Sequence, residues 1–116
     1  MTETTTPKRQ TRRTDPTTTV LAEVRTVRKE LAASRLPVAG GERPEKGRSY
    51  HQRQSIRWGA IDQARTLAET PGWDSALLAA AYGALAEPDP ERARPNLVRL
   101  AALAVAAVED IGQEGA

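Results

Sequence analysis

The chain has no cysteine and no phenylalanine, and its 116 residues include only two tryptophans, two tyrosines and one methionine. Without thiols it forms no disulfide, and it offers neither a zinc–thiolate site nor a cysteine nucleophile. Any core must be built from Ala, Leu, Val and Ile, which bury little area each at about 25 cal/mol per Å² of apolar surface. We therefore expect one small domain that completes its core as a homo-oligomer, a dimer or larger.

Long apolar runs are also missing. The longest, residues 100–108, is too short to cross a membrane and is followed by Glu109 and Asp110. Nothing at the N-terminus has the pattern of a signal peptide. We predict a cytoplasmic protein that makes no contact with a membrane.

Acidic side chains are scarce at the N-terminus, where Glu3 is the only acid among the first thirteen residues. This Thr-rich segment carries four basic residues: Lys8, Arg9, Arg12 and Arg13. It lacks the apolar groups that would offset the entropy of ordering, so we expect residues 1–15 to be a disordered arm. The arm is either a solvated extension or an electrostatic contact for nucleic acid. No aromatic residue lies between the basic ones, so a base-stacking platform is not supported.

No alternating β pattern of useful length occurs, and the periodicity predicts an all-α fold. Val20, Val24, Val27 and Leu31 recur at spacings of four, three and four, after an Asp15-Pro16 helix start. The expected helices cover residues 16–35, 49–69, 73–86 and 95–111, within a helical domain spanning 16–111, and 112–116 form a tail.

Three local signals set the expected boundaries. Residues 36–48 carry prolines and glycines and are expected to form a mobile loop. Ser49 with Gln52 three residues later has the form of a capping box, and Ile56, Ala60, Ala64 and Leu67 should form the buried face of the helix that follows. Pro95 inside a helix would cost roughly 3 kcal/mol, so we expect one isolated turn at 90–94 before the last helix.

The second half of the chain reads IRWGAIDQARTL and then GWDSALLAAAYGALAEPDPERARPNLVRLAALAVAAVEDI. Together with the helix and variable loop before it, this layout resembles the MazG-like nucleoside triphosphate pyrophosphohydrolases, notably small versions in actinobacteria and their phages. The resemblance covers residues 20–111. It implies an antiparallel four-helix bundle that assembles through these helices.

In that family, carboxylates on two successive helices hold magnesium ions, which neutralise the triphosphate and activate water. The resemblance places those positions at residues that supply no carboxylate: Ala79, Ala80, Gly83, Asn96 and Arg99. We therefore predict no catalytic residue, no metal site and no cofactor, and a protein that has lost hydrolysis and acts by binding a nucleotide or a partner protein. The alternative is that these small residues form an ordinary tight helix contact.

A more specific hypothesis is that the chain binds a nucleotide without a metal ion. Arg57, Arg65 and Arg99 could meet phosphates, while Trp58 stacks on a base; the default interpretation is a solvated helix face. His51, the only histidine, lacks an orienting acid and is expected to be an exposed surface residue. The alternative function is a small helical interaction or structural module, of a kind that a phage could encode, whose basic arm contacts nucleic acid or a protein assembly.

Overall fold

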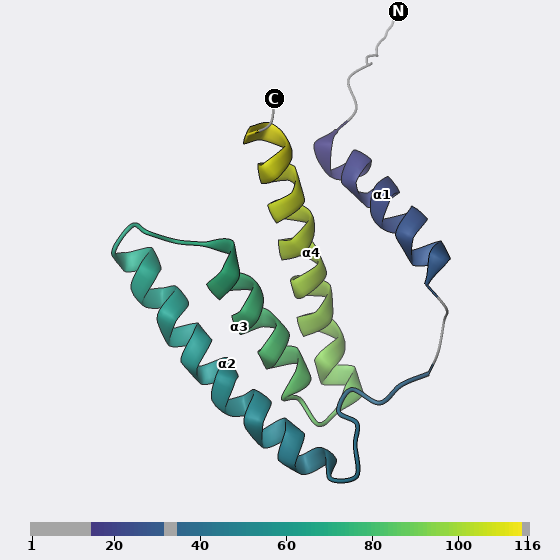
Figure 1. Cartoon of the computed structure of the whole chain (residues 1–116), viewed down its shortest axis with the longest axis vertical. Helices are drawn as coiled ribbons and strands as arrows, with labels where there is room; N and C mark the ends of the chain where they lie inside the picture. Colours follow the sequence, from purple (N-terminus) through teal and green to yellow (C-terminus); the bar gives the residue numbers. More distant parts are fainter. Residues whose placement is uncertain (1–14, 32–34, 115–116) are drawn as a thin grey trace, which may run out of the picture. The chain divides into compact units, whose positions relative to one another are not determined.

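The computed structural model describes residues 15–31 and 35–114, and these form four helices and no strand (Figure 1). The helices are α1 (Pro16–Glu30), α2 (Pro44–Leu67), α3 (Trp73–Leu85) and α4 (Pro90–Glu114). The predicted all-α class is thereby confirmed. No helix in the described ranges is long and apolar enough to span a bilayer. The expected disordered arm lies outside the described residues.

The chain divides into two compact units. One contains α1 together with α4 from Val108 onward, and the other contains α2, α3 and residues 90–107 of α4. Few large side chains are buried in either, since the buried apolar residues of the described ranges are Val20, Ala84, Ala93 and Ala107. The lean core expected from the composition is therefore present.

Helix α1 begins as predicted, with Asp15 at the N-cap and Pro16 at the first helical position. It ends at Glu30, before the expected residue 35, and the Leu31 N–H closes the last turn on the Val27 carbonyl at 3.1 Å. Within the same unit, the Thr17 hydroxyl donates a 2.8 Å hydrogen bond to the Glu109 carboxylate. Val20 is the only buried residue of this helix.

Helix α2 begins at Pro44 rather than at Ser49, which shortens the predicted 36–48 loop. A proline in the first turn followed by Glu45 provides a start signal of its own, because the proline lacks an N–H and the acid faces the positive end of the helix. Ser49 is consequently an interior residue whose hydroxyl donates to the Glu45 carbonyl at 3.0 Å, and not a cap.

The end of α2 is a Schellman motif built on a non-glycine residue. The Thr70 N–H bonds to the Arg65 carbonyl at 2.8 Å, and the Glu69 N–H bonds to the Thr66 carbonyl at 3.1 Å. Glu69 adopts the left-handed conformation, with φ of 63°. This turn reverses the chain, so that α3 packs antiparallel on α2.

The face that α2 turns toward α3 is polar, which corrects the predicted buried stripe. No residue of α2 is buried, and Ile56 and Leu67 remain 64% and 78% exposed. The side that meets α3 instead presents residues at helical spacings of four, seven and three: His51, Ser55, Asp62 and Arg65. Each of these residues lies against a residue of α3. These hydrogen bonds and ring contacts, rather than the apolar periodicity, determine which face of α2 is turned toward α3.

Helix α4 runs without interruption from Pro90, so the predicted isolated turn before Pro95 is wrong. The helix start is fixed by Asp89, whose carboxylate accepts the Glu91 N–H at 3.1 Å and whose carbonyl accepts the Ala93 N–H at 2.9 Å. The proline ring fixes φ at a value that a helix can accept, and the helix continues through Pro95 although that residue offers no backbone N–H.

Candidate ligand cavity between α2, α3 and α4

The second unit contains a cavity of about 270 Å³ that is lined by three helices. Its lining residues are Asp62 from α2, Ala76, Ala79, Ala80 and Gly83 from α3, and Asn96, Arg99 and Leu103 from α4. All five positions that the resemblance aligned with the metal-binding positions of that family are therefore gathered around one cavity.

The helical period explains this gathering. On α3, Ala76, Ala79, Ala80 and Gly83 are spaced by three, one and three residues and share one face; on α4, Asn96, Arg99 and Leu103 are spaced by three and four. The α3 side chains are a methyl group or less, so they leave volume that larger residues would fill. The cavity is thus a direct product of small residues at helical spacing.

One carboxylate, Asp62, enters the cavity from α2. Its Oδ1 accepts a 2.8 Å hydrogen bond from the hydroxyl of Ser75, which is fully buried. The Ser75 hydroxyl has one proton, and its alternative acceptor, the Gly72 carbonyl, is farther at 3.3 Å. The bond therefore holds Asp62 in place, and Oδ2 of Asp62 accepts no hydrogen bond from a described residue.

The other polar groups at the cavity come from α4. The Arg99 guanidinium makes no ion pair or hydrogen bond with any residue in the described ranges, and it is exposed. Asn96 is half-buried and supplies an amide with both a donor and an acceptor. The cavity therefore combines one cation, one carboxylate and one amide with a wall of small α3 residues, mostly alanines.

This donor set does not fit a magnesium pair. Mg²⁺ requires near-octahedral oxygen coordination, commonly through carboxylates, and here the lining offers a single carboxylate beside the Arg99 cation, which repels a metal ion. Across the described residues, no group of three or more His, Asp or Glu side chains is placed to hold a metal.

Of the four predicted ligand residues, only Arg99 lines the cavity. The Arg57 guanidinium lies 5.8 Å from the ring centroid of its neighbour Trp58. Arg65 forms a 2.8 Å ion pair with Asp74, and this hydrogen bond, together with the Ser75 N–H, holds the pKa of Asp74 below its ordinary value of 3.8. The structure thus does not bring the four predicted residues into one anion site.

His51 is half-buried, which corrects its expected exposure. Its ring lies 5.8 Å from that of Tyr82 on α3 and 5.7 Å from that of Tyr50, and its Nδ1 is buried without a hydrogen-bond partner among the described residues. Because α2 starts five residues earlier than predicted, residue 51 falls in the helix interior on the face that meets α3.

Sequence analysis did not single out two polar residues of this region, Asp62 at the cavity and its hydrogen-bond donor Ser75. For Asp62, the available signal was its helical spacing from Ser55 and Arg65 on α2, but the apolar residues on another face of α2 indicated that face as the buried one. The predicted nucleic-acid residues Lys8, Arg9, Arg12 and Arg13 lie outside the described ranges. A comparison of the chain with protein-family models, curated proteins and solved structures finds no match to it.

Proposed function

We propose that this chain is a helical binding protein of MazG-like layout that has lost metal-dependent hydrolysis and holds a nucleotide by its phosphate in the cavity between α2, α3 and α4. One observation carries the proposal. The five positions chosen from the sequence, on two different helices, all line the same cavity: Ala79, Ala80, Gly83, Asn96 and Arg99. Five unrelated positions on two helices need not converge in this way.

The groups around the cavity favour an anionic ligand. Arg99 has no competing partner among the described residues and can pair with a phosphate through two parallel hydrogen bonds. Asn96 can donate a further hydrogen bond, and the free Oδ2 of Asp62 can accept one from a hydroxyl or amino group. The ligand therefore carries an anionic group and, a short distance away, a hydrogen-bond donor.

The volume limits how much of the ligand is enclosed. At about 270 Å³ the cavity lies just below the usual range of small-molecule pockets, roughly 300–1,000 Å³. It can take a phosphate group and part of a sugar, while the remainder of a nucleotide projects into solvent. Affinity should accordingly be modest and depend on the phosphate end.

Isothermal titration calorimetry of the full chain tests this proposal, with nucleoside monophosphates, nucleoside triphosphates and inorganic phosphate in metal-free buffer. Arg99→Ala should weaken binding by roughly tenfold or more, since hydrogen bonds to charged groups contribute about 1.5–3 kcal/mol. Arg94→Ala is the matched control, because Arg94 is exposed on the same helix and does not line the cavity. Equal effects of both substitutions, or no heat with any ligand, would refute the proposal.

The same samples, supplied with Mg²⁺ and a nucleoside triphosphate, should release no pyrophosphate above the buffer background. Turnover that disappears on addition of EDTA would show that the chain is a metal enzyme after all.

A further inference from the structure

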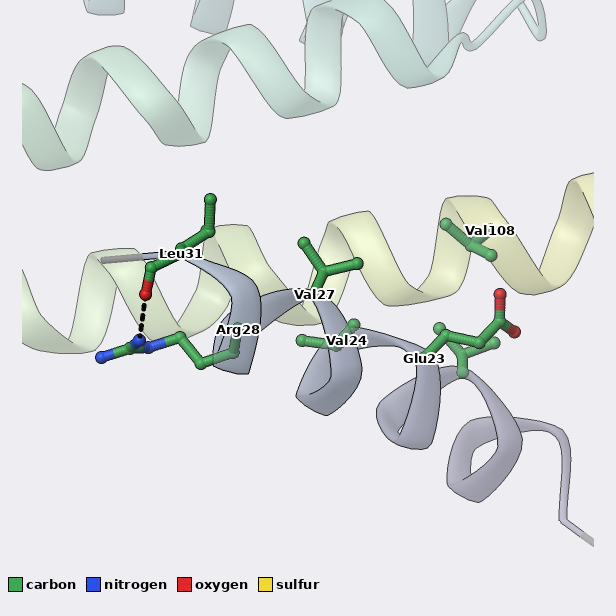
Figure 2. Close-up of a pocket in the computed structure, with 7 residues that line it drawn as sticks. Glu23, Val24, Val27, Arg28, Leu31 and Val108 are labelled. Atoms are coloured by element: carbon green, nitrogen blue, oxygen red, sulfur yellow. Dashed lines mark hydrogen bonds between the residues drawn. The ribbon is translucent and has the colours of Figure 1, made fainter. Parts of the chain in front are cut away.

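Helix α1 leaves most of its apolar stripe uncovered. Val24, Val27 and Leu31 are 49%, 52% and 60% exposed, whereas Val20 at the start of the stripe is buried. These residues line a groove of about 350 Å³ whose walls also include Glu23, Arg28 and Val108, all within one compact unit (Figure 2). Water contact along about two turns at the end of a 15-residue helix leaves that helix poorly stabilised on its own.

From this groove we infer that α1 pairs in parallel with α1 of a second copy of the chain, as a short two-stranded coiled coil. The spacing of four, three and four matches the inner positions of a heptad repeat, written a to g with a and d apolar. Val24 then occupies an a position and Val27 the d position after it. By the same spacing Val20, already buried within its own unit, falls at the preceding d position, and Leu31, the extended C-cap residue just after the helix, falls at the next a position.

The charged residues beside the stripe favour α1 of a second copy as the partner, and they favour a parallel orientation of the two helices. In this register Glu23 is a g position and Arg28 is the e position five residues later. A parallel pair brings Glu23 of each copy opposite Arg28 of the other, which gives two attractive contacts. An antiparallel pair would instead bring g positions together, and Glu23 would meet Glu30 of the second copy, which is repulsive.

Arg28 is available for this contact. Its guanidinium makes one hydrogen bond within the described residues, a long one of 3.5 Å to the Leu31 carbonyl (Figure 2). A carboxylate at ordinary ion-pair distance would be a stronger partner than this carbonyl. Rearrangement of Arg28 therefore costs little on pairing.

A second uncovered group of apolar residues, on α2, is a weaker candidate for self-pairing. Ile56 and Leu67 are more exposed than the α1 residues, but the ionic side chains beside them are Arg53 and Arg57, both positive. Two copies meeting through that face would bring like charges together. The combination of an apolar stripe with one acid and one base at g and e is found on α1.

The pairing should be weak and measurable. About two heptads bury an area at the low end of specific interfaces, so we expect a dissociation constant on the order of micromolar. Sedimentation of the full chain over a wide concentration range should show a monomer–dimer equilibrium. A chain that stays monomeric throughout, or assembles equally well with Val27→Lys, would overturn the inference.

Val27→Lys places a charge at the centre of the pairing and should weaken self-association by about tenfold or more, equivalent to 1.4 kcal/mol per factor of ten. Lysine is a good helix former, so circular dichroism of the variant should be unchanged. Val98→Lys is the matched control, because Val98 is also a half-exposed valine, 56% exposed, but lies on α4 in the other unit.

Charge variants then fix the direction. In a parallel pair Glu23→Arg brings a second guanidinium against Arg28 and weakens association; in an antiparallel pair it relieves the Glu23–Glu30 repulsion and strengthens it. Mixing Glu23→Arg with Arg28→Glu should restore a heterodimer only if the pair is parallel. Stronger self-association of Glu23→Arg would overturn the parallel arrangement.

Because the chain has no native cysteine, Val24→Cys offers an independent check. Identical a positions face each other in a parallel pair, so mild oxidation should link two copies through this residue, while Val98→Cys should remain unlinked. Failure of Val24→Cys to cross-link at concentrations where the chain is dimeric would likewise contradict the inference.

Discussion

At the scale of single residues, the ion pair between Arg65 and Asp74 predicts a pH-dependent contribution to stability. The Asp74 carboxylate accepts hydrogen bonds from the Arg65 guanidinium and from the Ser75 N–H, and these keep the pKa of Asp74 below 3.8 in the folded chain. A carboxyl whose folded pKa is depressed stabilises the fold above its unfolded pKa, and this contribution is lost as pH falls through the folded pKa. The urea midpoint of the natural chain should therefore exceed that of Asp74→Asn at neutral pH, and the difference should vanish in acid.

The control repeats the comparison in chains that lack Arg65. The urea midpoints of Arg65→Gln and of the double variant Arg65→Gln, Asp74→Asn should differ much less, because Arg65 makes the largest contribution to the lowered pKa of Asp74. A gap between Asp74→Asn and the natural chain that stays constant down to the lowest pH would mean that the ion pair does not contribute. High salt should reduce the gap, since both side chains are partly exposed.

Gly83 shows how far residue-level reasoning from the sequence could go. A glycine inside a helix indicates either close approach of another backbone or open space, and the sequence alone left both open. In the structure Gly83 borders the cavity, and a Cβ added there would lie 3.5 Å from the Ser55 hydroxyl, which is ordinary van der Waals contact. The position tolerates an alanine, so steric need does not explain the glycine.

At the scale of secondary-structure elements, α4 contains two prolines with opposite expected effects. Pro95→Ala restores an N–H donor for the Glu91 carbonyl and removes the ring from the helix interior, so it should raise the melting temperature and add up to about 3 kcal/mol to the free energy of unfolding. Pro90→Ala, at the helix start where proline is favoured, should be neutral or slightly destabilising. Thermal melts monitored by circular dichroism compare the two. A lower melting temperature for Pro95→Ala would show that the proline is needed in its surroundings.

The sequence predicted that the chain forms helices. It was less informative about the residues at which each helix begins and ends, and about which face of each helix is turned toward its neighbour. The Asp15-Pro16 start is local and is found in the structure, whereas the last helix begins at Pro90 and not at the predicted residue 95. The rotation of α2 depends on partners supplied by α3, and its apolar stripe pointed to the wrong face because the composition of one helix carries no information about its neighbour.

At the scale of the whole molecule, the basic N-terminal segment gives a further prediction. Residues 1–14 have no apolar periodicity, so deleting them should leave helical content and melting temperature nearly unchanged. If the segment contacts nucleic acid, the deletion should also abolish a mobility shift that weakens with added salt. A drop of many degrees in melting temperature would instead assign the segment a structural role.

The cavity was predictable in part for a geometric reason. Helical spacing alone places Ala79, Ala80 and Gly83 on one face of α3, and Asn96 with Arg99 on one face of α4. Asp62 was not predictable, since its position depends on how α2 rotates against α3. Arg57 and Arg65 are also on α2, so the rotation of α2 likewise explains why they do not line the cavity with Arg99.

The polar contacts between α2 and α3 have a consequence for how many structures the chain could adopt. An alanine-rich face such as that of α3 is smooth, and on apolar packing alone it could slide along a neighbouring helix into several alignments of nearly equal energy. The buried Ser75–Asp62 hydrogen bond forms in one alignment and is broken in the others, where the Ser75 hydroxyl is left with only its longer 3.3 Å contact to the Gly72 carbonyl and Asp62 loses its donor. These contacts separate the native alignment from its competitors by an energy gap that small apolar residues could not supply.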